Sequence, residues 1–173
     1  MTFEEASHFL SATEIDNSQP SAWADLGCGD GLFSQVLSSR LCSGSTIYAI
    51  DKTAQHNIDS TNKEVRIVFR KADFVNDDLQ LQNLDGILMA NALHYVEDKV
   101  ALLWKLKQYL LPEGVFIIIE YDNAKANRWV PYPISFTQLT ELFAKEGYQH
   151  IEKTGERKSI YQSGKMYVCS IKR

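Results

Sequence analysis

The feature that most constrains this chain is a glycine-rich turn between an apolar run and an amphipathic segment. Residues Asp25–Gly31 read Asp-Leu-Gly-Cys-Gly-Asp-Gly and begin within the last two residues of the apolar run Ala22–Leu26. Glycine lets a backbone turn tightly and approach a ligand closely where a Cβ would block it. A helix that follows presents free N–H groups and the positive end of its dipole. This order predicts a site for a polar ligand with carboxylate or hydroxyl oxygens, and an ordinary structural turn is the alternative.

The rest of the chain alternates apolar runs with amphipathic segments, which predicts parallel strands joined by helices. Predicted strands are Ala22–Leu26, Thr46–Ile50, Val65–Arg70, Ile87–Ala90 and Val115–Ile119. The first two predicted helices cover Phe3–Leu10 and the residues from Asp30, as N-cap, to Leu41. A third contains an apolar stripe from Val96 through Val100 to Leu110. The fourth begins with a Ser135–Gln138 capping box and ends at Gly147.

The end of the chain breaks this alternation. Tyr148–Thr154 and Lys165–Ile171 are two extended segments with no helix between them. Two strands joined by a short loop can only pair antiparallel. We therefore expect a single α/β domain over residues 1–173, with residues 1–20 forming a short helix and lead-in, and a mostly parallel sheet that ends in an antiparallel pair.

Two acids follow the second and third predicted strands. Asp51 lies twenty residues after Gly31, where an acid reaches the hydroxyls of a ribose bound over a glycine turn. Such charge-assisted hydrogen bonds are each worth about 1.5–3 kcal/mol. Asp73 can accept from the exocyclic amine of adenine, and Phe74 can add its ring or its backbone N–H. Turn aspartates and a core aromatic are the alternatives.

Leu32 narrows the choice of ligand. The dinucleotide fingerprint GxGxxG requires glycine at this position, because the chain passes the pyrophosphate closely there. This sequence reads GxGxG and then Leu32. A bulky side chain at that point disfavours a bound diphosphate.

Charge and cysteine content exclude several classes of function. The 173 residues carry a formal net charge of −4 with scattered Lys and Arg, which disfavours nucleic acid as a partner. Cys28, Cys42 and Cys169 are far apart and show no metal or redox spacing, so we expect no metal and reduced thiols. The acidic start lacks the basic region of a secretory signal, and Val115–Ile119 is too short to cross a bilayer. The expected location is cytoplasmic, with no membrane partner.

Taken together, these motifs resemble the class I S-adenosylmethionine-dependent methyltransferases. Asp25–Gly31 resembles the first motif of that superfamily, Tyr48–Asp51 the second and Lys71–Phe74 the third. Asp85–Val96 resembles the fourth-strand segment of the small-molecule branch, which includes quinone C-methyltransferases. The resemblance extends from about residue 20 to the end of the chain.

The resemblance implies a Rossmann-like three-layer sandwich, with a seven-stranded sheet whose last strand is antiparallel. It implies S-adenosylmethionine as cofactor and S-adenosylhomocysteine as product. Asp25 and the backbone at Gly27 would face the methionine end, Lys52 would lie beside the adenine, and the backbone of Asn91 would pass the methionine group. The predicted cofactor-binding residues are Asp25, Gly27, Gly29, Gly31, Asp51, Lys52, Asp73, Phe74 and Asn91.

Methyl transfer from a sulfonium is an in-line displacement, and the leaving thioether needs no proton. Alignment of acceptor and methyl can supply about 7–11 kcal/mol, and a base helps only where the acceptor must lose a proton. His94 is the candidate catalytic base, because it follows the fourth strand and imidazole titrates near neutral pH. A histidine that makes only local hydrogen bonds is the alternative.

The candidate substrate residues are mostly aromatic. They are Tyr95, Tyr121, Arg128 and Tyr132, and the last two belong to the loop Asn127–Pro133. Arg128 can pair with an anionic acceptor, although a lone arginine is usually solvated. The Asn/Asp-Pro-Pro-aromatic signature of methylation on bases and glutamines is absent after the fourth strand. This absence disfavours a DNA or release-factor substrate.

Only about twenty residues precede the first strand, so the helical lid of many relatives is reduced to one short helix. In one interpretation, a partner subunit in a homodimer or the N-terminal segment closes the acceptor pocket. In the other, the mouth of the pocket is open and admits a bulky acceptor.

Two further functions remain as alternatives. One is a nucleotide-dependent oxidoreductase, which Leu32 and the antiparallel tail disfavour, and the other is a non-catalytic binder of S-adenosylmethionine.

Overall fold

The computed structural model describes residues 1–53, 58–158 and 164–173. Its described strands form one seven-stranded sheet in the order β3-β2-β1-β4-β5-β7-β6. The strands are β1 (Ala22–Leu26), β2 (Thr46–Asp51), β3 (Arg66–Lys71), β4 (Leu84–Ala90), β5 (Leu110–Tyr121), β6 (His150–Lys158) and β7 (Lys165–Lys172). Neighbours among β1 to β5 pair parallel, whereas β7 is antiparallel to both β5 and β6. The predicted mostly parallel sheet with an antiparallel end is confirmed.

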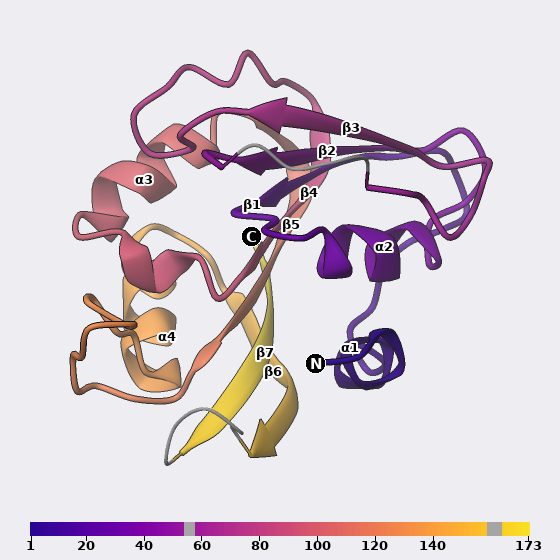
Figure 1. Cartoon of the computed structure of the whole chain (residues 1–173). Helices are drawn as coiled ribbons and strands as arrows, with labels where there is room; N and C mark the ends of the chain where they lie inside the picture. Colours follow the sequence, from indigo (N-terminus) through magenta and orange to yellow (C-terminus); the bar gives the residue numbers. More distant parts are fainter. Residues whose placement is uncertain (54–57, 159–163) are drawn as a thin grey trace.

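Helices cover both faces of this sheet and complete a three-layer sandwich. The helices α1 (Phe3–Phe9) and α2 (Leu32–Ser38) lie on one face, and α3 (Lys99–Leu106) and α4 (Phe136–Lys145) on the other (Figure 1). A short 3-10 helix, η1 (Leu93–Tyr95), follows β4. The predicted capping box at the start of α4 is present.

The alternation of side chains along β5 explains why its apolar run is continuous. Phe116 and Ile118 belong to the apolar cluster beneath α3 and α4, whereas Ile117 and Ile119 belong to the cluster beneath α1 and α2. Successive side chains of a strand point to opposite faces of a sheet. A strand buried on both faces must therefore be apolar at every position, as the sequence predicted.

Three local predictions for the helices are wrong. The helix predicted to run to Leu110 ends at Leu106, because Leu110 already begins β5. Asp30 does not cap α2: Gly31 occupies the N-cap with a φ of +84°, and the Asp30 carboxylate accepts only a long bond of 3.4 Å from the Leu32 N–H. Val100 is 47% exposed and not part of a buried stripe. The reason is that α3 begins only at Lys99, with Asp98 as its N-cap. The spacing of apolar residues counted from Val96 therefore does not predict which side of α3 is buried.

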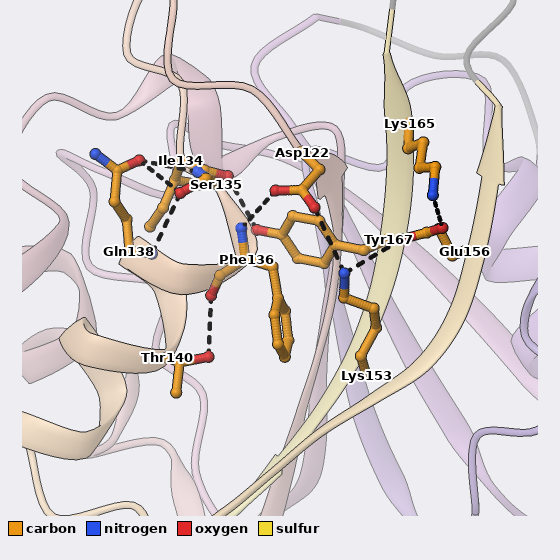
Figure 2. A network of polar contacts seen from close by, with 10 residues as sticks. All are labelled: Asp122, Ile134, Ser135, Phe136, Gln138, Thr140, Lys153, Glu156, Lys165 and Tyr167. Atoms are coloured by element: carbon orange, nitrogen blue, oxygen red, sulfur yellow. Dashed lines mark hydrogen bonds and ion pairs between the residues drawn. The ribbon is translucent and has the colours of Figure 1, made fainter.

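The segment between β5 and α4 is fixed to the sheet at both ends (Figure 2). The Asp122 carboxylate accepts from the Phe136 N–H at 2.9 Å and lies 3.4 Å from the Lys153 ammonium on β6. The Tyr167 hydroxyl on β7 donates to the Ile134 carbonyl at 3.1 Å. Residues 122–136 therefore have a defined position beside the carboxyl end of β5.

Candidate functional site

The strand order brings the predicted site residues to one edge of the sheet. Asp73 follows β3, Asp51 ends β2, Gly27 follows β1, Asn91 follows β4 and Tyr121 ends β5. These are the carboxyl ends of five neighbouring parallel strands, and four strand spacings amount to roughly 19 Å. Open α/β sheets bind ligands at this edge.

A cavity of about 650 Å³, here called the edge cavity, opens along this line. Its opposite wall is formed by η1 and α3, including Tyr95, Ala101 and Lys105. Six of the nine predicted cofactor-binding residues line it. They are Gly27, Asp51, Lys52, Asp73, Phe74 and Asn91.

The other three predicted residues lie around this cavity. Gly29 lines a smaller cavity of about 250 Å³, which shares Gly27 and Asn91 with the edge cavity. Asp25 lies beneath the turn, outside both linings. Gly31 is also outside them, and a Cβ there would lie 2.5 Å from the Ile58 side chain. Its glycine therefore has a packing reason that the sequence did not reveal.

The glycine turn is held by the end of β2. The Gly29 N–H donates to Asp51 Oδ2 at 3.0 Å, and the Thr53 N–H donates to Asp51 Oδ1 at 2.8 Å. A Cβ on Gly27 would lie 2.6 Å from the Ala92 Cβ, so this residue must be glycine for the turn to pass η1. An ionised carboxylate has about four acceptor sites, so Asp51 keeps about two for a ligand.

Two buried oxygen atoms at this edge have no hydrogen-bond partner in the described part of the chain. Asp25 is 1% exposed, and its Oδ2 accepts from the Ser34 hydroxyl at 2.5 Å, while its Oδ1 has none. The other is Oδ1 of Asn91. Unsatisfied buried acceptors are costly and rare, so they indicate a missing donor. The ammonium group of a bound amino acid has the required chemistry.

Burial raises the pKa of Asp25 to about 7. The hydrogen bond from Ser34 opposes this shift, whereas the nearby charge of Asp51 adds to it. A cationic ligand group beside Asp25 would favour the ionised form. The carboxylate is therefore suited to a ligand that brings a positive charge.

The turn after β3 is built by Asp73 and fastened to α3. The Asp73 carboxylate accepts from the Val75 N–H at 2.9 Å and from the side-chain amide of Asn76 at 3.0 Å. Burial alone would raise the pKa of Asp73. The hydrogen bonds from Val75 and Asn76 outweigh this effect, so the pKa of Asp73 is lowered below its usual value. The Lys105 ammonium donates to the carbonyls of Phe74 and Val75, both at 3.1 Å. Asp73 thus orders its own turn and also faces the edge cavity.

A further cavity of about 510 Å³, here called the side cavity, lies beyond β4. Its lining is Asn91, His94, Tyr95, Tyr121, Asn127, Trp129 and Val130. Asn91 and Tyr95 also line the edge cavity, so the two spaces adjoin. Three predicted acceptor-side residues, His94, Tyr95 and Tyr121, are brought together here.

Two predicted substrate residues lie outside these linings, and their assignment stays a prediction. The Arg128 guanidinium lies 5.8 Å from the centroid of the Trp129 ring. The Tyr132 hydroxyl donates to the Glu97 carboxylate at 3.3 Å. The loop residues that line the side cavity are Asn127, Trp129 and Val130 instead.

His94 has a partner that sequence reasoning missed. Glu120 Oε2 lies 2.7 Å from His94 Nδ1, and Glu120 Oε1 accepts from the His94 backbone N–H at 3.1 Å. Glu120 directly follows the apolar run Val115–Ile119. A charged residue continuing such a strand is rarely buried without a partner, and that is the signal that could have found it.

No helix in the described ranges is long and apolar enough to cross a membrane. In the same part of the chain, no group of three or more His, Cys, Asp or Glu side chains could hold a metal ion.

Comparisons with known proteins agree with this geometry. A family model described as a methyltransferase domain matches residues 21–165. No match was found among curated proteins. The structure is similar to an S-adenosylmethionine-dependent methyltransferase from Aquifex aeolicus, with a TM-score of 0.68 and 16% identity over 98% of this chain and 90% of that chain.

Two further solved structures share the fold. One is an S-adenosylmethionine-dependent methyltransferase from Leishmania major, with a TM-score of 0.69 and 15% identity over 98% of this chain and 72% of that chain. The other is the 1,6-didemethyltoxoflavin-N1-methyltransferase of Burkholderia thailandensis with its substrate and S-adenosylhomocysteine bound. It has a TM-score of 0.65 and 18% identity over 99% of this chain and 77% of that chain. The family match decides against the oxidoreductase alternative. The chain belongs to the methyltransferase-domain family and is a class I S-adenosylmethionine-dependent methyltransferase.

Proposed function

We propose that this methyltransferase binds S-adenosylmethionine along the carboxyl edge of the sheet and methylates a small molecule bound in the side cavity. The ribose of S-adenosylmethionine would lie at Asp51, and its methionine end between Gly27 and Asn91. The adenine would lie near Lys52, Asp73 and Phe74. The observation that carries this proposal is the meeting of the two cavities at Asn91.

The two orphan oxygens support the methionine end of this arrangement. Asp25 Oδ1 and Asn91 Oδ1 are acceptors without donors in the described chain; Asp25 lies on β1, two residues before Gly27, and Asn91 follows the neighbouring strand β4. A bound ammonium group would satisfy them. Open space above Gly29, where a Cβ would meet no atom of the described residues within 4 Å, leaves room for a ligand to approach the backbone.

The acceptor side supports a small molecule. When bound, S-adenosylmethionine supplies a methyl group on a sulfonium sulfur that leaves as a neutral thioether. The residues of the side cavity would align the acceptor with that methyl, which is the main contribution to such a displacement. A cavity of about 510 Å³ lies within the range of drug-sized ligand sites. His94 would act as the catalytic base for an acceptor that loses a proton.

The donor site is tested by filling the edge cavity without touching a polar group. Ala101→Trp, which lines this cavity, should weaken S-adenosylhomocysteine binding in calorimetry. Val100→Trp introduces the same side chain one residue earlier, at an exposed position outside the lining, and should not weaken binding. Equal effects of the two variants, or no binding by the parent protein, would contradict the donor site.

The acceptor is tested with radiolabelled S-adenosylmethionine in a cell extract separated by size. We expect label in the small-molecule fraction. Label confined to proteins or nucleic acids would contradict the small-molecule acceptor while leaving the donor site intact.

A further inference from the structure

The His94–Glu120 pair is buried at the wall of the side cavity. Glu120 is 1% and His94 2% exposed. A buried carboxylate is costly unless it is hydrogen-bonded, and here both of its oxygens accept from His94. The Tyr121 N–H adds a third bond at 3.3 Å. Both oxygens of this carboxylate are therefore hydrogen-bonded, and Oε2 holds the imidazole.

The contact also fixes which ring nitrogen of His94 keeps a lone pair. An ionised carboxylate can only accept hydrogen bonds, so Nδ1 must carry the proton. Nε2 is then the acceptor of the neutral ring, and it has no hydrogen-bond partner in the described part of the chain. His94 lines the side cavity and so presents a proton acceptor at that site.

Other titratable groups surround the pair from each neighbouring element. Lys99 at the start of α3 lies near Glu120: burial lowers the Lys99 pKa and the charge of Glu120 opposes this shift. The Lys99 ammonium is held by the carbonyls of Val96 at 2.7 Å and Tyr132 at 2.8 Å. Tyr167 on β7 faces Glu120 as well, and burial raises its pKa. Tyr95 and Tyr121 flank the imidazole itself.

The aromatic rings of Tyr95, Tyr121 and Trp129 form a large part of this wall. The ring centroids of Tyr95 and Tyr121 lie 4.4 Å and 5.9 Å from that of His94. Trp129 is 73% and Tyr95 57% exposed, although both line the side cavity. Large aromatic faces left open at a pocket indicate a flat, apolar ligand surface.

Trp129 lies on a fixed turn. The Asn127 carboxamide oxygen accepts from the N–H groups of Trp129 at 2.8 Å and Val130 at 3.0 Å. The Tyr132 N–H donates to the His94 carbonyl at 3.0 Å, which ties the loop to η1. The aromatic wall and the proton acceptor are therefore held in one place.

We propose that the acceptor is a planar ring compound whose ring hydroxyl loses its proton during methylation, and that Glu120 is the positioning residue that keeps His94 ready to take it. This inference rests on the proposed function. The acceptor O–H bond breaks and its proton passes to His94 Nε2. The oxygen pair forms the new bond to the methyl carbon, while the pair of the broken carbon–sulfur bond remains on sulfur. The imidazolium stays paired with the Glu120 carboxylate and later releases the proton to water.

The first experiment measures the ring nitrogens directly, without any acceptor. Histidine nitrogen NMR of the complete protein with S-adenosylhomocysteine should show neutral His94 with its proton on Nδ1, assigned by the loss of the signal in His94→Gln. Glu120→Gln should change that tautomer signal. Glu113→Gln, the same change at an exposed position of β5, should not. A proton on Nε2 in the parent protein would overturn the proposal.

The second experiment compares acceptors in matched pairs of planar compounds. Phenols of one and two rings are tested against pyridines of the same size, which need not lose a proton. We expect methylation of at least one phenol and no pyridine, with a kcat lower by about 10²–10⁴-fold in His94→Gln. Glu120→Gln should lower kcat at least about tenfold with little change in KM, and Glu120→Asp should restore part of it. The fall of activity at acid pH should disappear in His94→Gln.

The outcomes separate the two levels of the account. Methylation of pyridines alone, or of phenols with undiminished kcat in His94→Gln, would overturn the inference. No methylation of any phenol by a protein that binds S-adenosylhomocysteine would also overturn it, and would leave the donor site standing. Failure to bind S-adenosylhomocysteine at all would instead contradict the proposed function.

Discussion

Replacing Asp51 by alanine is the sharpest test of the donor site. One oxygen of this carboxylate accepts from the Gly29 N–H and the other from the Thr53 N–H, at 3.0 Å and 2.8 Å. About two acceptor sites remain, enough for the two hydroxyls of a ribose. Losing them should cost at least the value of one such bond, about 1.5–3 kcal/mol of S-adenosylhomocysteine affinity, and so raise Kd at least roughly 10- to 150-fold.

The variant also frees the Gly29 N–H, so a loosened glycine turn could imitate this effect. Calorimetry with an S-adenosylhomocysteine analogue that lacks both ribose hydroxyls separates the two causes, because a double cycle isolates the pairwise interaction. Asp51→Ala should weaken binding of S-adenosylhomocysteine far more than binding of the analogue without ribose hydroxyls. Equal losses for both ligands would refute a direct contact between Asp51 and the ribose, and no loss for either would refute any role in binding.

Three further variants test separate parts of the structure. Burial raises the pKa of Asp25 from 3.8 to about 7, so the contribution of Asp25 to stability is complete below about pH 4 and is lost as pH rises through about 7. Asp25→Asn should remove this fall of Tm with rising pH. A parallel fall of Tm in the parent protein and the variant would contradict the prediction. Lys105→Met frees the turn after β3 and should raise the Kd for S-adenosylhomocysteine roughly 3- to 10-fold, whereas Lys107→Met, near the end of the same helix, should change only Tm. Gly27→Ala should lose about 1–3 kcal/mol more in denaturant unfolding than Gly147→Ala, because both have a positive φ but only Gly27 meets a neighbour; equal losses would refute the packing argument.

The sheet could be predicted because its strands are short, apolar and separated by clear turn signals. The continuous apolar run Val115–Ile119 indicated a strand buried on both faces, and the missing helix before Lys165–Ile171 indicated an antiparallel end. Helix starts were harder. A left-handed glycine at position 31 and a cap at Asp98 depend on how the chain enters each helix, which local periodicity does not encode.

The donor side of the site was accessible for a related reason. Parallel topology aligns the strand ends, so acids placed after the second and third strands had to meet the glycine turn. The acceptor side depends on long-range contacts instead. Glu120 joins His94 across 26 residues, and the turn made by Asn127 brings Trp129 to the side cavity in place of Arg128. A single sequence can indicate that Glu120 needs a partner, but it contains no signal for which residue that partner is.

A crystal structure of the protein soaked with S-adenosylhomocysteine tests the central claim most directly. We predict the ribose hydroxyls at the Asp51 carboxylate, the adenine between Phe74 and α3, and the amino group near the unpartnered oxygens of Asp25 and Asn91. Density for the ligand at any other surface, with the edge cavity unfilled, would contradict the account.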